Sequence, residues 1–514
     1  MRKNLPVLFV ILAMMTAVQT VFAQRYTNEI FTSVQVTPSV VYGMNKEVLT
    51  GAPVMKNLTM DVYEPAGDVQ TTRPLIIYMH TGSFLPPVIN GNPTGSRYDS
   101  TVVEMCKQFA RRGYVVAAMS YRLGWNPVSS DQDVRTGSLL QAVYRAMQDA
   151  KACVRYFREE ATVNANPFRV DTSKIILGGQ GTGGYIAMAY ASVDKLSEIN
   201  LSKFISNTTN MSYGFIAGQS YVLQPIWGDF DGYGGDTTYN YPNNHVGYNN
   251  RVQFVFNMGG ALGDSSWLEA GDAPMVAFHV AGDPFAPFGN GMVYVPTQPP
   301  MPVVNVSGSS VVVTKANALG NNACFNSFNY NDAYTQAANA VNGGQDGLYP
   351  FYTNPAIQSG PWEWYDSLSL VLFSQAIGQP AAAGTQAYMN GKATNPDMSK
   401  AKGMAYIDTI QNYVNPRIVN CLGLSVGVND IEHDRANVGV YPNPSNGQFT
   451  IDLSNVGNNP KYIRIADLSG RVVSEVKAQE KTAYAFRGID LSSGLYLVKI
   501  GFDGGEIAKK LVIN

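Results

Sequence analysis

The most constraining feature of the sequence is a run of seven residues that contains five glycines: Gly178-Gly179-Gln180-Gly181-Thr182-Gly183-Gly184. A short apolar run at residues 174–177 precedes it, and a helical stretch at residues 185–192 follows. A turn this rich in glycine lets backbone segments approach closely and permits conformations that other residues avoid. The pattern therefore predicts a strand that turns sharply into a helix.

Short apolar runs and longer helical stretches alternate through much of the chain. Residues 103–112 and 139–157 carry apolar side chains at three- and four-residue spacing, which indicates helices that bury one face. This alternation predicts an α/β fold, with a mostly parallel central sheet and helices on both faces. The predicted strands are residues 58–63, 75–79, 114–120, 175–177, 252–258 and 275–279.

Two stretches interrupt this alternation. Residues 200–250 and 290–310 are rich in Gly, Asn, Pro and Tyr. Loops of this length inside a compact domain are usually lids or binding surfaces. We expect both to be insertions over the top of the sheet, with a last helix at residues 399–419 packing back on it.

The C-terminal part of the chain follows a different pattern. A turn sequence at residues 441–447 precedes alternating runs at 448–453, 462–468, 495–500 and 510–513, which predict a small β-sandwich. A chain of 514 residues is also too long for one compact core. The predicted organisation is a signal peptide (1–23), an α/β domain (24–421), a linker (422–436) and the sandwich (437–514).

The N-terminus indicates export. Arg2 and Lys3 precede an apolar run at residues 5–15, and Val21-Phe22-Ala23 offers a cleavage site. This run is shorter than the roughly 20 apolar residues that span a membrane. Because only 14% of the residues are charged and the net charge is −2, composition favours neither nucleic acid nor anionic membrane as a partner. We predict a near-neutral exported protein with no transmembrane segment in the mature chain.

The cysteines leave several pairings open. In an oxidising compartment, the four cysteines can form up to two disulfides among three connectivities, or remain as buried thiols. Their spacing suits no metal site, and no motif calls for a cofactor. These residues are Cys106, Cys153, Cys324 and Cys421.

The C-terminal segment contains four motifs in this order: Val440-Tyr441-Pro442-Asn443-Pro444, Asp467-Leu468-Ser469-Gly470-Arg471-Val472, Leu491-Ser492-Ser493-Gly494-Leu495-Tyr496 and Lys509-Lys510-Leu511-Val512. In these motifs and their order, the segment resembles the type A sorting domain of the type IX secretion system of Bacteroidota. This resemblance implies that the secretion machinery recognises residues 437–514. It also implies that the protein is extracellular or on the outer-membrane surface after passing through the periplasm.

Three features of residues 58–419 belong together: the glycine run after residue 177, the segment His80-Thr81-Gly82-Ser83-Phe84, and Asp283 after the last of the predicted strands. In these features the segment resembles secreted, esterase-type members of the α/β-hydrolase superfamily, with residues 80–84 as the oxyanion segment and Asp283 at the position of the family's acid. This resemblance implies a nucleophile elbow at Gly181 and a pocket beside it. The pocket residues it implies are His80, Thr81, Gly82, Ser83, Gln180 and Thr182.

The sequence departs from this family where acyl transfer takes place. Gly181 occupies the nucleophile position, and no histidine occurs in residues 331–352, where the family places its base. Acyl transfer by a hydroxyl group requires a base and a group that orients it. These departures predict a non-catalytic protein that binds a small molecule, a glycan or a protein.

One catalytic alternative stays open. Thr182 or Ser83 could serve as a displaced nucleophile activated by His245, which would have to approach Asp283. This arrangement would make the protein a secreted carboxylesterase with a rearranged triad. The other histidines lie in the oxyanion segment (His80), on the strand before the acid (His279) and in the predicted linker (His433).

Overall fold

A computed structural model describes residues 25–49, 51–424 and 438–514, except 455, 457–458, 468–469, 479, 481, 488–490 and 503–504. The predicted signal peptide, most of the predicted linker and His433 lie outside the described residues. The contacts divide the chain into a large unit, Tyr26–Leu422, and a second unit that contains Gly423–Asn514.

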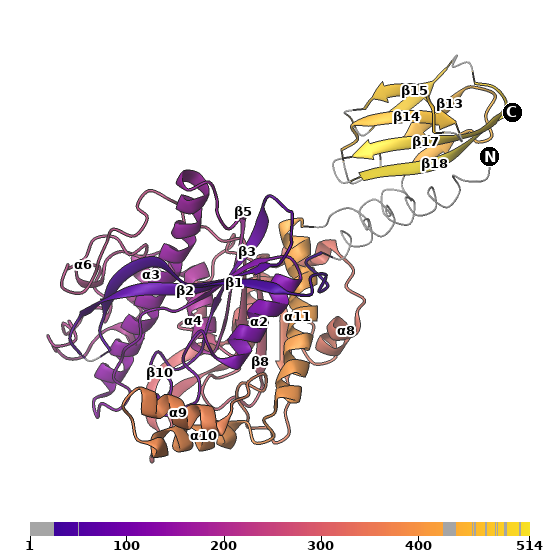
Figure 1. Cartoon of the computed structure of the whole chain (residues 1–514). Coiled ribbons are helices and arrows are strands. Elements are labelled where there is room, and N and C mark those ends of the chain that lie inside the picture. Colours follow the sequence, from indigo (N-terminus) through magenta and orange to yellow (C-terminus); the bar gives the residue numbers. More distant parts are fainter. Residues whose placement is uncertain are drawn as a thin grey trace. The chain divides into compact units, whose positions relative to one another are not determined.

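An eight-stranded sheet forms the centre of the large unit (Figure 1). Its order is β1-β2-β4-β3-β5-β6-β8-β11; β1 and β2 are antiparallel to their neighbours, and the strands from β4 to β11 are parallel. Each predicted strand coincides with one of these. The strands are β1 (Val34–Glu47), β2 (Val54–Pro65), β3 (Arg73–Met79), β4 (Val115–Met119), β5 (Val170–Gln180), β6 (Phe254–Met258), β8 (Met275–Val280) and β11 (Leu348–Phe351).

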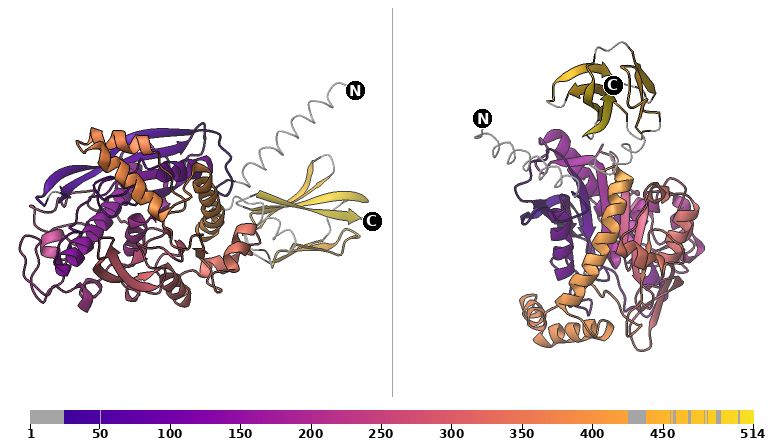
Figure 2. Two further views of the ribbon diagram at one scale, coloured as in Figure 1. Left: turned by 90° about the horizontal axis from the view of Figure 1, so that it is seen from below. Right: turned by 90° about the vertical axis from the view of Figure 1, so that its right-hand side faces the viewer.

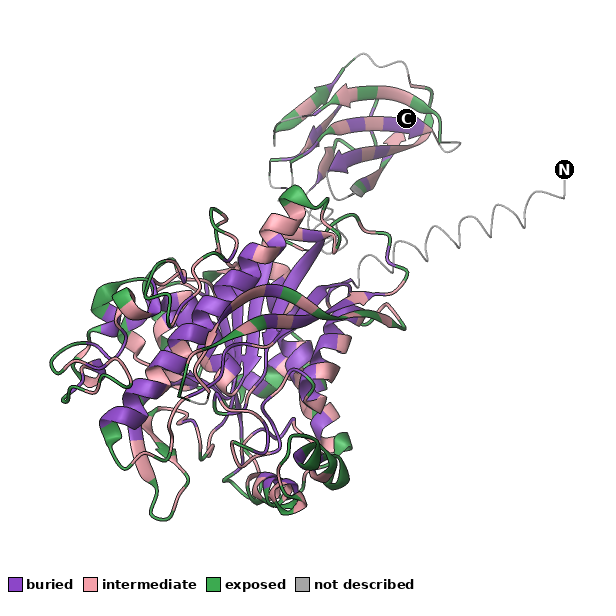
Figure 3. Ribbon diagram, turned by 60° about the vertical axis from the view of Figure 1, so that its left-hand side comes forward, coloured by how far each residue is buried: buried purple, intermediate pink, exposed green. Residues whose placement is uncertain are grey.

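Helices cover both faces of the sheet. α2 (Ser100–Arg111) and α11 (Lys400–Leu422) pack together on one face, while α3 (Gln132–Val163), α4 (Thr182–Ser192) and α7 (Ser309–Ala318) cover the other (Figure 1). Every residue of β3, β4, β6 and β8 is therefore buried (Figure 3). This burial explains why these strands are continuous apolar runs. The predicted α/β-hydrolase fold is confirmed.

A helical hairpin lies at the carboxyl edge of the sheet, where the parallel strands end. It consists of α9 (Ser367–Ala376) and α10 (Ala381–Thr394), and Figure 2 shows it beside the end of α11 where the chain enters that helix. Asn390 of α10 donates to the Gly91 carbonyl (2.6 Å), and Asn395 donates to the Glu363 carbonyl (3.1 Å). These bonds hold the hairpin against the loops that follow β3 and β11.

The insertion at residues 200–250 contacts α3 from the carboxyl edge onward, where Asn207 and Tyr221 donate to Asp133 at the start of the helix. It packs along the outer side of α3: Gln141 donates to the Tyr213 carbonyl (2.9 Å) and Tyr144 to the Gly228 carbonyl (2.9 Å). The polar side chains of α3 satisfy carbonyl groups of an otherwise irregular segment. This insertion contains α6 (Gln224–Trp227) and the single-turn helix η1 (Ser202–Phe204), and α5 (Leu196–Ile199) precedes it.

The second insertion forms a strand pair instead of a loop. β9 (Asn290–Val295) pairs with β10 (Met301–Gly308), which also pairs with the short β7 (Ala261–Leu262). Thr136 at the start of α3 donates to the Val303 carbonyl (2.6 Å). The remaining short helices are η2 (Ser265–Trp267), η3 (Ala323–Ser327) and α8 (Ala333–Asn339).

The second unit is the predicted small β-sandwich. Two antiparallel sheets, β12-β13-β16 and β15-β14-β17-β18, enclose a core that includes Ile451, Ile463, Val498 and Leu511. The strands are β12 (Gly439–Tyr441), β13 (Phe449–Asp452), β14 (Tyr462–Asp467), β15 (Val472–Lys477), β16 (Ala483–Phe486), β17 (Gly494–Phe502) and β18 (Gly505–Ile513). Among the described residues, no helix has the length and hydropathy needed to cross a membrane.

The cysteines adopt one of the arrangements that the sequence left open. Cys324 and Cys421 form a disulfide that joins η3 to the end of α11, across 97 positions of the chain. Cys106 and Cys153 are buried free thiols.

The disulfide should stabilise the large unit. Because a cross-link over a long loop restricts the unfolded chain, the Cys324→Ser/Cys421→Ser variant should lose roughly 2–5 kcal/mol of unfolding free energy in urea titrations. Reductant should lower the stability of the parent protein to that of the variant and leave the variant unchanged. Equal stability of the parent in its oxidised and fully reduced forms would contradict this expectation.

Candidate functional site

The predicted elbow is present at the carboxyl edge of the sheet. β5 ends at Gln180, α4 begins at Thr182, and Gly181 between them has φ 51° and ψ −116°. A residue with a side chain would be strained in this conformation. A Cβ atom on Gly183 would lie 2.2 Å from the Met79 carbonyl oxygen, so the turn also requires glycine there to let α4 approach β3.

The space at the nucleophile position is already filled. A Cβ atom on Gly181 would lie only 2.0 Å from Thr81 Oγ1 and 2.9 Å from Thr81 Cβ. β3 and β5 are neighbours with Met79 opposite Gly179, so the segment after β3 runs directly beside the elbow. The Thr81 side chain therefore occupies the space that a side chain at position 181 would need.

The oxyanion segment forms a tight turn after β3. Gly82 has φ 120°, and a Cβ atom on it would lie 2.2 Å from the Gly95 Cα atom, so only glycine fits. Ser83 also has a positive φ of 53° and is exposed, and its carbonyl oxygen accepts from Trp125 Nε1 (2.6 Å). These contacts position the backbone of the turn, while the Ser83 hydroxyl has no described base beside it.

His80 is buried and is held in a neutral form. Its ring stacks on Tyr121 with 4.5 Å between ring centroids, and its Nδ1 donates to the Thr81 carbonyl oxygen (2.5 Å). Burial lowers the pKa of His80 to about 4. The imidazole is therefore uncharged near neutral pH and is a weak proton acceptor.

The Thr182 hydroxyl group is hydrogen-bonded to the Tyr121 side chain. A nucleophilic threonine would instead need a base as its partner. Tyr121 donates its one proton to the His80 carbonyl oxygen (2.9 Å), so Thr182 donates to the Tyr121 oxygen (2.9 Å). Burial raises the pKa of Tyr121, which keeps the phenol protonated. This pair has no group that could accept the threonine proton.

His245 and Asp283 are engaged with different partners. The two ring nitrogens of His245 contact the Glu159 carboxylate and the Tyr42 carbonyl oxygen (2.7 Å). Glu159 lies near the C-terminal end of α3, and this helix begins at the carboxyl edge after β4 and runs back along the sheet. His245 is thus anchored at the end of α3 remote from the elbow.

Asp283 has donors other than histidine. Its Oδ1 accepts from the backbone amides of Phe285 (2.8 Å) and Ala286 (3.1 Å), and its Oδ2 accepts from Ser359 Oγ (2.8 Å). Burial raises the pKa of Asp283 to about 6. Ser359 therefore occupies the hydrogen-bonding position that a triad histidine would need.

His279 is also bound on both sides. Its Nε2 donates to the Ala286 carbonyl oxygen (3.0 Å), so its Nδ1 accepts from Ser309 Oγ (2.7 Å). Burial lowers the pKa of His279 to about 4. Its hydrogen bonds connect β8 to the loop that follows this strand and to α7.

A second feature of the edge, Glu363, was not predicted as a site residue. The buried Gln180 side chain accepts from the Tyr78 hydroxyl (2.9 Å) and donates to Glu363 Oε1 (3.0 Å). Tyr365 donates to the other carboxyl oxygen. The run Pro361 to Asp366 gave no sign of this role, because Glu363 meets Gln180 only through the packing of segments 183 positions apart.

Glu363 belongs to a group of three carboxyl groups with raised pKa values. Burial, and then repulsion from Asp99 and Asp283, raise the pKa of Glu363 to about 8. Burial raises the pKa of Asp99 to about 7. No group of three or more His, Cys, Asp or Glu side chains suited to a metal ion occurs among the described residues.

The parallel sheet, the elbow after β5 and the turn after β3 define the class of the large unit as an α/β-hydrolase fold of the esterase type. Residues 60–217 match the BD-FAE family, and residues 439–514 match the secretion system C-terminal sorting domain. Both resemblances inferred from the sequence are thereby confirmed. The sorting domain implies recognition by the type IX secretion machinery and export to the cell surface or extracellular space.

Individual proteins are similar to parts of the chain. Ulvan lyase NLR42 of Nonlabens ulvanivorans is 32% identical over 80 residues, which are 15% of this chain and 15% of that protein. Esterase 2 of Thermogutta terrifontis phosphorylated by paraoxon is 19% identical and covers 50% of this chain and 74% of its own, with a TM-score of 0.29. Its propionate-bound form is 20% identical over 51% of this chain and 77% of its own, with a TM-score of 0.30.

The contact between Thr81 and Gly181 can be tested by stability. Gly181→Ala should lose roughly 1–3 kcal/mol more than Gly218→Ala, because overpacking adds to the backbone strain. Gly218 is a matched control, since its φ of 79° is also positive but no atom lies near its Cβ position. Thr81→Ala in the Gly181→Ala background should recover part of the loss in thermal unfolding. Equal losses in the two single variants would refute the contact.

The raised pKa of Glu363 predicts a pH-dependent stability. The folded state retains a proton that the unfolded chain releases near pH 4.5, so stability should fall as pH rises from about 5 to about 8 and then level off. Glu363→Gln keeps the shape without the titration and should make this fall shallower in thermal unfolding experiments, while Asp99 and Asp283 still contribute to it. The exposed Glu480→Gln is the control and should leave the profile unchanged. An unchanged profile in Glu363→Gln would rule out this assignment.

Proposed function

We propose that this chain is an exported, non-catalytic relative of the esterases that acts as a binding protein at the cell surface or in the medium. The observation that carries the proposal is the Thr81 side chain in the space beside Gly181. A covalent acyl intermediate needs a nucleophile aimed from this turn, and here the turn has no side chain and little room for one.

The surroundings of the elbow support the same proposal. His80 and His279 are buried with low pKa values, and His245 is engaged by Glu159 away from the elbow. Removal of a nucleophile or base from a hydrolase triad lowers turnover by roughly six orders of magnitude. The remaining fold can still bind ligands, because binding needs shape and hydrogen bonds but no proton transfer.

Activity-based labelling tests the proposal. The mature protein should not react with a fluorophosphonate probe and should not hydrolyse p-nitrophenyl acetate or butyrate above the uncatalysed rate. Gly181→Ser should remain inactive as well, since no base accompanies the new hydroxyl group. A serine esterase assayed in parallel provides the positive control for both reagents.

The catalytic alternative predicts a different pattern. An esterase that uses a displaced nucleophile would be labelled by the probe, and turnover would disappear in Thr182→Ala or Ser83→Ala. Turnover lost in either variant, with thermal stability retained, would overturn the proposal.

A further inference from the structure

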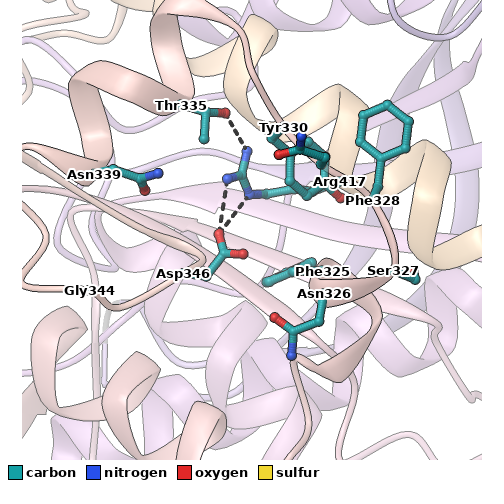
Figure 4. A pocket seen from close by; sticks show the side chains of 11 residues that line it. Phe325, Asn326, Ser327, Phe328, Tyr330, Thr335, Asn339, Gly344, Asp346 and Arg417 are labelled. Carbon is teal, nitrogen blue, oxygen red and sulfur yellow. Dashed lines mark hydrogen bonds and ion pairs between the residues drawn. The ribbon is translucent and has the colours of Figure 1, made fainter.

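A pocket lies at the amino edge of the sheet, opposite the edge that carries the elbow. Its volume is about 640 Å³, within the range of roughly 300–1,000 Å³ that is typical of small-molecule sites. Asp346 in its wall lies just before β11, where that strand begins, whereas the elbow follows the end of β5. The lining residues are Phe325, Asn326, Ser327, Phe328, Asn329, Tyr330, Thr335, Asn339, Gly344, Asp346 and Arg417 (Figure 4).

An ion pair between Arg417 and Asp346 forms the floor of this pocket. The fully buried Arg417 side chain donates to Asp346 Oδ1 (3.0 Å) and to Thr335 Oγ1 (3.3 Å). Its guanidinium group also lies over the rings of Tyr413 (3.5 Å to the centroid) and Tyr330 (4.4 Å). The lining contains no other charged side chain. Arg417 offsets the charge of Asp346, but only the Asp346 side chain is exposed (36%), so the pocket disfavours an anionic ligand.

The walls combine aromatic rings with carboxamide groups. Phe328 is 44% exposed, and its ring centroid lies 5.1 Å from that of Tyr330. The exposed side chains of Asn326 and Asn339 lie around the ion pair (Figure 4). Carboxamides both donate and accept hydrogen bonds, while an exposed ring offers an apolar surface for stacking. A matching ligand is uncharged, has one flat apolar face and carries several hydroxyl groups.

The loop that carries Phe328 is fixed to α11 in the ligand-free protein. The Cys324–Cys421 disulfide fixes the start of the loop to α11, and Asn420 donates to the Cys324 carbonyl oxygen (2.5 Å) and to Ser327 Oγ (3.0 Å). A loop fixed to a long helix loses less conformational entropy on binding. Because Phe328 remains exposed on this fixed loop, its ring is available to a ligand and does not serve the hydrophobic core.

We propose that this pocket binds a mono- or disaccharide unit of a neutral glycan, with Phe328 stacking on a sugar ring and Asn339 bonding to its hydroxyl groups. This proposal does not depend on whether the elbow is catalytic. It assigns a binding site to the amino edge of the sheet, away from Gly181.

Calorimetry with defined oligosaccharides tests the proposal. The probes are cellotriose, xylotriose, mannotriose, maltotriose and triacetylchitotriose, with trigalacturonate as the charged counterpart. The mature protein should bind at least one neutral probe more tightly than trigalacturonate. Phe328→Ala should weaken that binding about tenfold, because the sugar ring loses the aromatic face on which it stacks.

Substitutions inside and outside the pocket lining distinguish a loss of this binding site from a general effect of removing a side chain. Asn339→Ala should also weaken binding, whereas Tyr352→Ala should not, because Tyr352 is a 68% exposed aromatic outside the lining. Failure of all neutral probes to bind, tighter binding of trigalacturonate, or binding unaffected by Phe328→Ala would each overturn the saccharide site. None of these results would bear on ester hydrolysis, which the labelling experiment tests separately.

Discussion

The close approach of backbone segments at the end of β5 is the constraint on which the site depends. A Cβ atom on Gly179 would lie 2.3 Å from the Gly183 carbonyl carbon, and one on Gly183 would lie 2.2 Å from the Met79 carbonyl oxygen. These contacts bring α4 against β3 and force Gly181 into a conformation with positive φ. In a hydrolase this geometry presents a nucleophile. Here the turn carries Gly181, and the Thr81 side chain lies in the space beside it.

The electrostatics of the carboxyl edge are consistent with this change. A catalytic site pairs an ionised acid with a histidine that can take up a proton. In this protein two of the buried groups are held neutral near pH 7: the pKa of His80 is lowered to about 4, and that of Glu363 is raised to about 8. Hydrogen bonds from Tyr78 to Gln180 and from Gln180 to Glu363 then connect β3, β5 and the loop after β11. These polar groups thus form a packed network at the carboxyl edge.

Much of the fold could be predicted because its strands are buried on both faces. Apolar runs such as β3 and β4 have no exposed side, so their position is visible without knowledge of their neighbours. The glycine run at 178–184 located the elbow because a sharp turn from strand to helix needs glycine, although some of these glycines make room for distant segments, as Gly183 does for Met79. The path of the insertion at 200–250 could not be predicted in detail, because it depends on side chains of α3, such as Gln141, whose partners have no local signal in the sequence.

The sequence by itself determined that Gly181 stands where a nucleophile is expected, that no histidine follows the acid at the usual place, and that a sorting domain ends the chain. These are properties of residue identity and order. Only the tertiary structure decided that the Thr81 side chain lies beside Gly181, that Glu363 bonds to Gln180, and that Cys324 pairs with Cys421. Each of these joins segments far apart in the chain, and their contacts follow from the packing of the whole sheet and its helices.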